Sequence, residues 1–544
     1  MRRGADTETG FRIVKIRDEG DPLLNITLDT IRRGKQALIF LNTKQRAEKA
    51  AEDLSKHIIL NAEEKKKLEE LSQKAFSALE TPTEQCRKLA SAIRQGVAFH
   101  HSGLVQEQRE LIEENFRSGL IKIICCTPTL AYGLDLPAFR VIVRDLKRFG
   151  TRGMDWIPVL EVQQMFGRAG RPSYDSEGEA ICIADNEAQE DLIRKRYIHG
   201  VPEEIYSKLA VEPVLRTYIL SLISAGIVSS RESILSFFTR TFWAHQFRDT
   251  NTLYGIIENM LDQLREWGFV EWGHNVKETT EAFVSADELE NKRESSIMAT
   301  RLGQRVSQLY IDPLTAYELI NSFQIAEKKE HDTFAVLQRI SNTLEMRPLL
   351  NVRVKEYEEI EDFLMEHEHL LIQAPPREYD LEYDDFIKSV KTAMLFSDWI
   401  EEKNEDYLME KYGIRPGEFS VKRGNADWLL YSAEELCKLL SLRRTEAEVR
   451  RLRIRMEYGA REELIPLLRL KGIGRVKARI LYNNRIRDLG DVAKAPIPTL
   501  AQLLGKNLAV SIKKQVGEKV PEEEYAQKPG KKQDGQIGLR SFEE

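Results

Sequence analysis

The chain has 544 residues, of which 42% are hydrophobic and 31% charged, and its formal net charge is −6. This length fits three or four domains with sizeable cores. No apolar run approaches the ~18 residues of a membrane span, which excludes a membrane protein, and no apolar secretion signal opens the chain. Five cysteines without zinc-site spacing indicate reduced thiols in a cytoplasmic protein with no metal site of its own.

The charge is distributed unevenly along the chain. Residues 441–520 hold 19 Lys and Arg against 8 Asp and Glu, a net charge of +11, which leaves −17 for the remainder. A basic module on an acidic body is typical of a local nucleic-acid contact. A solvated helical surface of mixed charge would have the same composition.

Residues 1–199 alternate short apolar runs with helical patterns. The runs have the length and composition of buried parallel strands, and they cover residues 36–41, 97–103, 121–127, 139–146 and 179–184. Helices are predicted at 44–58 and 106–119. This alternation predicts a parallel α/β sheet.

From about residue 200 the pattern becomes helical. Two helical stripes end at Gly226 and Gly268, and a short strand follows at 269–272. Helices followed by a short β element indicate a winged helix, although an unrelated helical insert would give a similar pattern. Residues 300–435 are almost wholly helical in pattern, and a charged helix is predicted at 436–458.

Three segments of the first 199 residues carry motifs that suit nucleotide chemistry. They are AFHHSGL (98–104), CTPTLAYGLDLPA (126–138) and QQMFGRAGRP (163–172). Arg168 and Arg171 can clamp phosphate oxygens from one helical edge. Thr127 can meet a phosphate and Asp135 can accept a hydrogen bond from a ribose. The two histidines of the first segment fit a structural role better than a catalytic one.

Together these segments resemble the second RecA-like domain of superfamily 2 helicases, specifically the Ski-like branch. The segments that follow resemble archaeal helicases of the Holliday-junction-migration (Hjm) type. The resemblance implies a multidomain α/β plus all-α fold. Its parts would be a RecA-like parallel α/β domain at 1–199, a winged helix at 200–298, a helical ratchet domain at 299–440, a helix–hairpin–helix domain at 441–519 and a disordered tail at 520–544.

The resemblance also implies an ATP site. Arg168 and Arg171 would contact the γ-phosphate and Gln164 would sense the nucleotide. Gly133, Asp135 and Gly167 would lie beside it. ATP and Mg²⁺ would bind only jointly with a first RecA-like domain.

The same resemblance implies contacts to DNA. Thr43 and Thr127 would lie by backbone phosphates, and residues 147–159 would form a β-hairpin that separates the duplex. Phe149, Met154 and Trp156 would stack on bases there, unless they only pack the hairpin.

In the ratchet range, Trp428 would stack a base while Lys422 or Arg423 meets a phosphate. The alternative is that Trp428 belongs to the core. The position where the family pattern places a basic residue is Val421 in this sequence.

Residues 468–482 (LRLKGIGRVKARILY) carry a helix–hairpin–helix signature. Gly472 and Gly474 would hold a phosphate through backbone N–H groups, and Arg475, Lys477 and Arg479 would add charge. Such contacts read no base sequence. A plain helical turn is the alternative.

The C-terminal QIGLRSF resembles a sliding-clamp-binding peptide, with Gln536, Leu539 and Phe542 as its contact residues. It lacks the usual second aromatic residue.

The sequence contains no Gly-x-x-x-x-Gly-Lys-Ser/Thr phosphate loop. We therefore expect the chain to lack the first motor domain and to hydrolyse no ATP by itself. The predicted function is the C-terminal part of an ATP-dependent 3′-to-5′ DNA helicase that acts on forked or stalled-replication DNA in repair and recombination. The alternatives are a non-catalytic single-stranded DNA-binding module and a Ski-like RNA helicase.

Overall fold

The computed structural model describes residues 4–5, 12–13, 15–18, 20–79, 81–132, 136–150, 153–171, 175, 177–209, 211–247, 250–273 and 296–518. The chain divides into two compact units. The first is formed by Met1–Leu319, Thr343–Asn351 and Asn404–Ala426, and the second by Ile320–Asn342, Val352–Lys403 and Asp427–Glu544. The range 299–440 thus contributes helices to both units.

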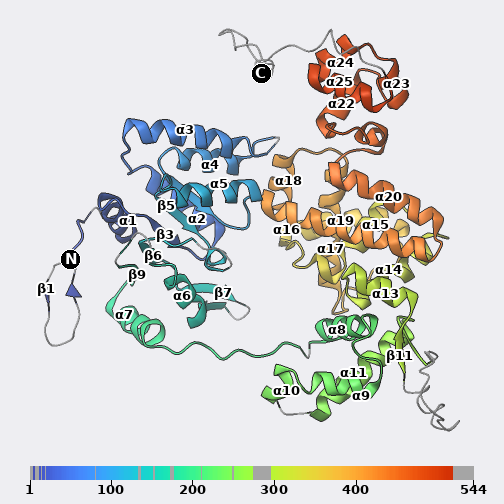
Figure 1. Cartoon of the computed structure of the whole chain (residues 1–544), viewed down its shortest axis with the longest axis horizontal. Helices are drawn as coiled ribbons and strands as arrows, with labels where there is room; N and C mark the ends of the chain where they lie inside the picture. Colours follow the sequence, from blue (N-terminus) through green and yellow to red (C-terminus); the bar gives the residue numbers. More distant parts are fainter. Residues whose placement is uncertain are drawn as a thin grey trace, which may run out of the picture. The chain divides into compact units, whose positions relative to one another are not determined.

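A five-stranded parallel sheet lies at the centre of the first 200 residues (Figure 1). Its strand order is β4-β5-β3-β6-β9. The strands are β3 (Ala37–Phe40), β4 (Val97–His100), β5 (Ile123–Cys126), β6 (Arg140–Val143) and β9 (Glu179–Cys182). All residues of β3 to β6 are buried, as expected for apolar strands covered on both faces. The predicted parallel α/β sheet is confirmed.

Helices connect and cover these strands. They are α1 (Pro22–Arg32), α2 (Lys44–Ser55), α3 (Ala62–Phe76), α4 (Glu84–Ile93), α5 (Gln106–Arg117), η1 (Pro128–Ala131), α6 (Val159–Phe166), α7 (Glu187–Ile193) and the π-helical η2 (Arg194–Ile198). Before α1, the pair β1 (Gly4–Ala5) and β2 (Arg12–Ile13) is antiparallel. Thr43 caps α2 by accepting a hydrogen bond from the backbone N–H of Arg46.

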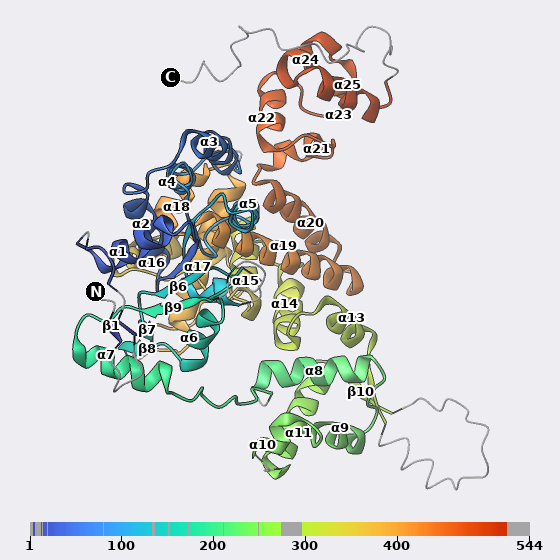
Figure 2. The same ribbon diagram turned by 60° about the vertical axis from the view of Figure 1, so that its left-hand side comes forward.

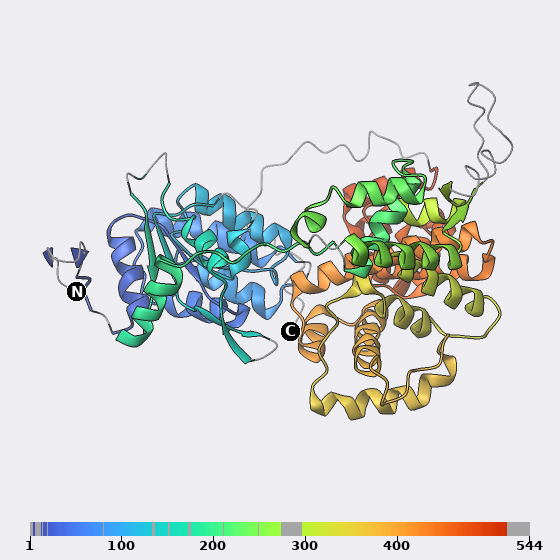
Figure 3. The same cartoon turned by 90° about the horizontal axis from the view of Figure 1, so that it is seen from below.

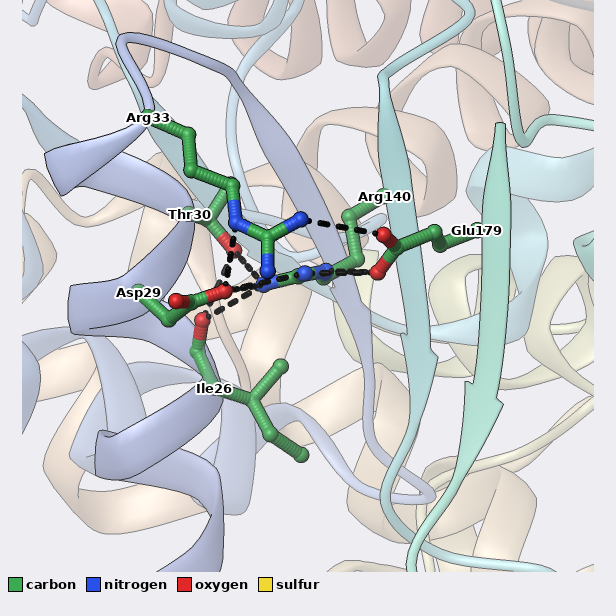
Figure 4. Close-up of polar contacts among 6 residues, drawn as sticks. All are labelled: Ile26, Asp29, Thr30, Arg33, Arg140 and Glu179. Carbon is green, nitrogen blue, oxygen red and sulfur yellow. Dashed lines mark hydrogen bonds and ion pairs between the residues drawn. The ribbon is translucent and has the colours of Figure 1, made fainter. Parts of the chain in front are cut away.

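A buried arginine joins α1 to the sheet. Arg140 on β6 is 1% exposed, and its guanidinium forms ion pairs with Asp29 of α1 and Glu179 of β9 at 3.1 and 2.6 Å. It also donates to the Ile26 carbonyl and to the Thr30 hydroxyl (Figure 4). Burial of this charge is compensated by two carboxylates and two further acceptors, which ties three elements together.

A β-hairpin follows β6. Strands β7 (Lys147–Gly150) and β8 (Gly153–Trp156) are antiparallel, with Lys147 opposite Trp156 and Phe149 opposite Met154. Figure 3 shows this hairpin, in teal, extending beyond the neighbouring helices of the fold. The structure confirms the hairpin that the resemblance implied.

Residues 211–309 form a helical group with a two-stranded antiparallel sheet (Figure 2). Its elements are α8 (Glu212–Ser224), α9 (Arg231–Phe238), α10 (Phe242–Phe247), α11 (Thr250–Glu266), β10 (Val270–Trp272), β11 (Ile297–Ala299) and α13 (Arg301–Leu309). Helix α8 packs against α11 and α13. The predicted helices and the strand at 269–272 are present.

The following residues are helical, as their pattern predicts. The elements are α14 (Pro313–Ala326), α15 (Thr333–Ser341), η3 (Leu344–Met346), α16 (Val354–His367), η4 (Glu368–Leu370), α17 (Tyr383–Ile400), α18 (Glu405–Tyr412), α19 (Pro416–Leu439) and α20 (Arg443–Tyr458). Within the second unit, α17 packs against α15, α16 and α20.

Short helices complete the second unit around a hydrophobic core of their own. They are η5 (Glu462–Leu464), α21 (Ile465–Leu468), α22 (Arg475–Asn483), α23 (Leu489–Lys494), α24 (Ile497–Leu504) and α25 (Lys506–Gln515). Over the described parts of the chain, no helix is long and apolar enough to cross a membrane.

Candidate nucleic-acid interface

The residues that follow the parallel strands gather at one edge of the sheet, because the carboxyl ends of parallel strands share an edge. Thr43 follows β3 and Thr127 follows β5, and both line one cavity of about 660 Å³. The Thr127 hydroxyl lies 2.9 Å from that of Thr129. The cavity therefore brings together the two threonines for which the resemblance implies contacts with backbone phosphates.

Three cations also line this cavity, namely Lys44, Arg148 and Arg415. Each is paired with a carboxylate. Lys44 binds Glu418, Arg148 binds both oxygens of Glu161 at 2.9 Å, and Arg415 binds Glu48 at 3.0 Å. Positive groups and hydroxyls at an open edge are the donors that a phosphodiester backbone needs.

These three cations are not among the residues predicted from the sequence. Lys44 and Arg148 adjoin predicted contact residues, so proximity to Thr43 and Phe149 was an available signal. Arg415 lies more than 280 residues after Thr127 in the chain, and no local pattern connects the two.

The two adjacent histidines have structural partners. His100 Nε2 lies 3.0 Å from Glu113 and His101 Nε2 lies 3.1 Å from Glu48. The Gly103 N–H donates to His101 Nδ1, so that nitrogen is unprotonated and Nε2 carries the proton. Burial lowers the pKa of His101, although its hydrogen bond to Glu48 acts in the opposite direction. Both contacts agree with the structural role predicted for these histidines.

The hairpin presents two apolar side chains to solvent. Phe149 is 83% exposed and Met154, its cross-strand partner, is 56% exposed. Trp156 differs, because Lys147 Nζ lies 4.5 Å from its ring centroid and Tyr197 packs against it. Exposed aromatic and thioether groups on a projecting strand pair suit contact with bases.

The two motif arginines lie beyond the helix that precedes them, which corrects the expected placement on one helical edge. Helix α6 ends at Phe166. Ala169 then forms a parallel bridge with Ala138, and Gly170 takes a φ of +90°, which favours glycine. The arginines therefore lie in a loop that this bridge holds against the sheet.

Their side chains have different surroundings. Arg168 donates twice to the Ala131 carbonyl, at 2.6 and 3.2 Å. Arg171 donates to Asp175 at 2.7 and 3.2 Å and to Gln36 at 2.6 Å. Arg168 thus uses two of its five N–H donors on a single carbonyl, whereas Arg171 is held by two side chains.

Of the four other residues predicted to contact the nucleotide, Gln164 and Gly167 are among the described residues. Gln164 is half-buried on α6 and Gly167 is exposed at its end. Gly133 and Asp135 lie outside the described residues, as do Gln536, Leu539 and Phe542 of the tail.

On α19 the predicted phosphate contacts are anchored within the protein. Lys422 donates to the carbonyls of Met346 and Pro348, at 3.3 and 2.6 Å, and its burial lowers its pKa. Arg423 and Trp428 are half-buried. Trp428 is therefore not fully enclosed in the core, which was the alternative to a role in stacking.

The Gly472–Gly474 turn lies between α21 and α22, as the signature predicts. Gly472 has a φ of +87°, and Lys477 donates to its carbonyl. Arg475 stacks 4.6 Å from the Trp399 ring centroid. Arg479 forms ion pairs with Glu402 and Glu463 at 2.5 and 2.9 Å, and these raise its pKa. The three predicted basic residues are thus held to different degrees.

Two family profiles match the chain. "Helicase conserved C-terminal domain" matches residues 21–173 and "Archaeal helicase, domain 4" matches residues 334–459. The first range contains strands β3, β4, β5 and β6 and most residues that line the cavity, whereas β9 and Arg415 lie outside it. The second range contains helices α16 to α20.

Curated relatives match over most of the chain. "ATP-dependent DNA helicase Hel308" of Pyrococcus horikoshii is 39% identical over 512 residues, which is 93% of this chain and 67% of the relative. The proteins of the same name from Methanococcus vannielii and Methanocella arvoryzae are 38% and 37% identical. These alignments cover 89% and 96% of this chain, and 67% and 68% of the relatives. The resemblance to archaeal superfamily 2 DNA helicases is confirmed, and the chain belongs to the Hel308 family of ATP-dependent DNA helicases.

Proposed function

We propose that this chain is the DNA-handling part of an ATP-dependent 3′-to-5′ DNA helicase that acts on forked or stalled-replication DNA. The observation that carries the proposal is the cavity where Thr43 and Thr127 meet Lys44, Arg148 and Arg415. Hydroxyls and cations from separate segments converge there at the carboxyl edge of a parallel sheet. A single strand would bind through its phosphates, so the contact would not depend on base sequence.

The hairpin supplies a means of separating strands. Phe149 and Met154 are exposed beside each other on β7 and β8. We assign to these two side chains the role of a wedge that inserts at the first base pair of the duplex. Unstacking a base step costs a few kcal/mol. Stacking of the freed base on an aromatic ring, worth about 1–3 kcal/mol, offsets much of this cost.

Arg168 is the residue that we assign to the γ-phosphate. Its guanidinium keeps donors beyond those that bind the Ala131 carbonyl and could stabilise charge in phosphoryl transfer. Arg171, held by Asp175 and Gln36, would position the loop and reach the nucleotide only if those contacts open. Gln164 and Gly167, with Gly133 and Asp135, complete the proposed nucleotide contacts.

Hydrolysis needs groups that these 544 residues do not contain. A phosphate loop would hold the β- and γ-phosphates together with Mg²⁺, and the sequence has none. We infer that a first RecA-like domain completes the ATP site. The relatives support this inference, because the alignments leave about a third of their length uncovered.

We assign the other segments by the same resemblance. Residues 200–298 would be a winged helix and 299–440 the ratchet, with Trp428 stacking a base and Arg423 meeting a phosphate. Residues 441–519 would grip the backbone through Gly472, Gly474, Arg475 and Lys477, and the tail 520–544 would recruit a sliding clamp.

Two other functions remain as alternatives. A non-catalytic DNA-binding module would use the same cavity without ATP, and an RNA helicase would use it on RNA. The helix–hairpin–helix signature at 468–482, which stands in a basic segment, favours DNA over RNA.

The test is competition binding to the purified chain. We expect labelled single-stranded DNA to be displaced by unlabelled DNA at lower concentrations than by RNA of the same sequence. We also expect Trp428→Ala to weaken DNA binding while leaving the salt dependence unchanged, since stacking neutralises no phosphate. Trp428→Phe, which retains an aromatic face, is the matched control. Tighter binding of RNA would favour the RNA helicase.

A further inference from the structure

The first turn of α19 contacts the loop after β4 backbone to backbone. The Gly417 N–H donates to the Gly103 carbonyl at 2.9 Å. A Cβ atom on Gly417 would lie 2.3 Å from the Leu104 oxygen and 2.5 Å from the Ser102 oxygen. One on Gly103 would lie 2.4 Å from Arg415 Cδ. Only glycine allows the two segments to approach this closely.

Two ion pairs flank this contact. Glu418 binds Lys44, and Arg415 binds Glu48, with both partners on α2. Although burial opposes their ionisation, these hydrogen bonds keep the pKa of both carboxyl groups below the usual value. Glu48 also holds His101, whose Nδ1 accepts from Gly103. The loop, α2 and the start of α19 therefore share one hydrogen-bonded network.

The next turns of α19 are anchored as well. Lys422 binds the carbonyls of Met346 and Pro348, and Asn425 donates to that of Glu345 at 2.9 Å. Glu345 in turn accepts from Asp312 and Thr315 at the start of α14. The first three turns of α19 are thus held along their length by residues of the first unit.

We propose that residues 415–418 form a fixed joint that makes the phosphate-facing edge of the RecA-like sheet and the first three turns of α19, up to Ala426, bind one DNA strand as a single site within the first unit. Gly417 and Glu48 are positioning residues in this joint. Lys44 and Arg415 serve both the joint and the cavity, since they line the cavity beside Thr43. The inference rests on the proposed function and adds a coupling between two segments of the DNA site.

A joint of this kind has a signature in the length of the bound strand. A long strand that is bound to one segment meets the other segment at a high effective concentration, so it binds with higher affinity. A short strand reaches only one of the two segments. Loosening the joint should weaken binding of long strands alone. A loss of folding would instead weaken binding of short and long strands together.

The experiment measures the affinity of the full chain for oligothymidylates of about 5 to 30 nucleotides by fluorescence anisotropy. Gly417→Ala is the test variant. Gly424→Ala is the matched control, because Gly424 lies on the same helix and a Cβ there meets no atom within 4 Å. We expect Gly417→Ala to lose at least about fivefold in affinity for the longest strand and less than about twofold for the shortest. We expect Gly424→Ala to match the parent throughout.

Glu48→Gln is a second variant for the case in which Gly417→Ala fails to fold. Glu48 does not line the cavity, and the change keeps its size while removing the charge that holds Arg415. The same loss confined to long strands supports the joint, and equal length dependence in this folded variant and the parent overturns it. A parent chain that binds no single-stranded DNA overturns the proposed function itself.

Discussion

The guanidinium of Arg171 and the carboxylate of Asp175 form a two-point contact, with hydrogen bonds of 2.7 and 3.2 Å. The Asp175 side chain is almost completely buried, and Lys35 also contacts it at 2.5 Å. These contacts, chiefly that of Arg171, lower the pKa of Asp175 to about 2. The pair therefore stabilises the loop that carries Arg168.

The first prediction concerns Asp175→Asn. A carboxyl whose pKa is lowered on folding stabilises the protein above its unfolded pKa and loses that effect as the pH falls through its folded pKa. We expect the variant to lose about 2 kcal/mol of unfolding free energy at pH 7. The difference from the parent should shrink as the pH falls from about 4 to about 2. Urea denaturation of both proteins across this pH range measures the difference in unfolding free energy. A difference that does not change with pH would contradict the lowered pKa of Asp175.

The second prediction concerns the buried Arg140. Arg140→Leu removes a cation that faces Asp29 and Glu179 and leaves both carboxylates without it. Breaking a buried pair in this way costs about 3–5 kcal/mol. Thermal unfolding of Arg140→Leu should have a markedly lower midpoint temperature than that of the parent. Arg94→Leu, which removes an arginine paired with Glu69 on the exposed surface, should change stability by no more than about 1 kcal/mol.

The third prediction concerns the hairpin. In a reconstituted helicase, Phe149→Ala should reduce duplex unwinding several-fold and leave single-strand binding close to the parent level, because we assign this side chain to the fork and not to the strand-binding cavity. Ile59→Ala is the control, since Ile59 is 93% exposed and does not line the cavity that holds Thr43 and Thr127. Unwinding assays on forked DNA measure the effect. A parallel loss of single-strand binding would place Phe149 in the strand-binding path.

The fourth prediction separates two basic residues of the helix–hairpin–helix segment. Lys477 donates to the Gly472 carbonyl at 3.1 Å, a contact that does not neutralise its charge. Lys477→Ala should therefore weaken DNA binding and reduce the salt slope by about one phosphate. Arg479 is held by Glu402 and Glu463, so Arg479→Ala should lower the thermal midpoint more than the affinity. Binding at several salt concentrations, beside thermal melts, distinguishes the two roles. If Lys477→Ala lowered the thermal midpoint and Arg479→Ala weakened DNA binding, the two assignments would be wrong.

Local sequence patterns predicted the elements because their physical causes are local. The apolar runs at 36–41 and 121–127 contain buried strands. The hairpin in the 147–159 segment was instead implied by the family resemblance. The carboxyl-edge position of Thr43 and Thr127 followed from the parallel sheet. Their convergence on one cavity could therefore be expected before the structure.

Contacts between distant segments could not be predicted in this way. Arg415 meets Glu48 across 367 residues, and nothing in either segment specifies the partner. The same holds for Arg479, whose basic neighbourhood suggested DNA while its carboxylate partners lie at Glu402 and Glu463. The loop placement of Arg168 also depends on the bridge between Ala138 and Ala169, a tertiary contact.

DNA-stimulated ATP hydrolysis distinguishes a helicase part from a DNA-binding module that works without ATP. The chain is assayed alone and mixed with a separately produced first RecA-like domain of the Pyrococcus horikoshii relative, and the mixture is repeated with Arg168→Ala. We expect no hydrolysis by the chain alone, DNA-stimulated hydrolysis by the mixture, and a loss of at least about a hundredfold with Arg168→Ala. Hydrolysis by the chain alone, or full activity of the Arg168→Ala mixture, would contradict these expectations.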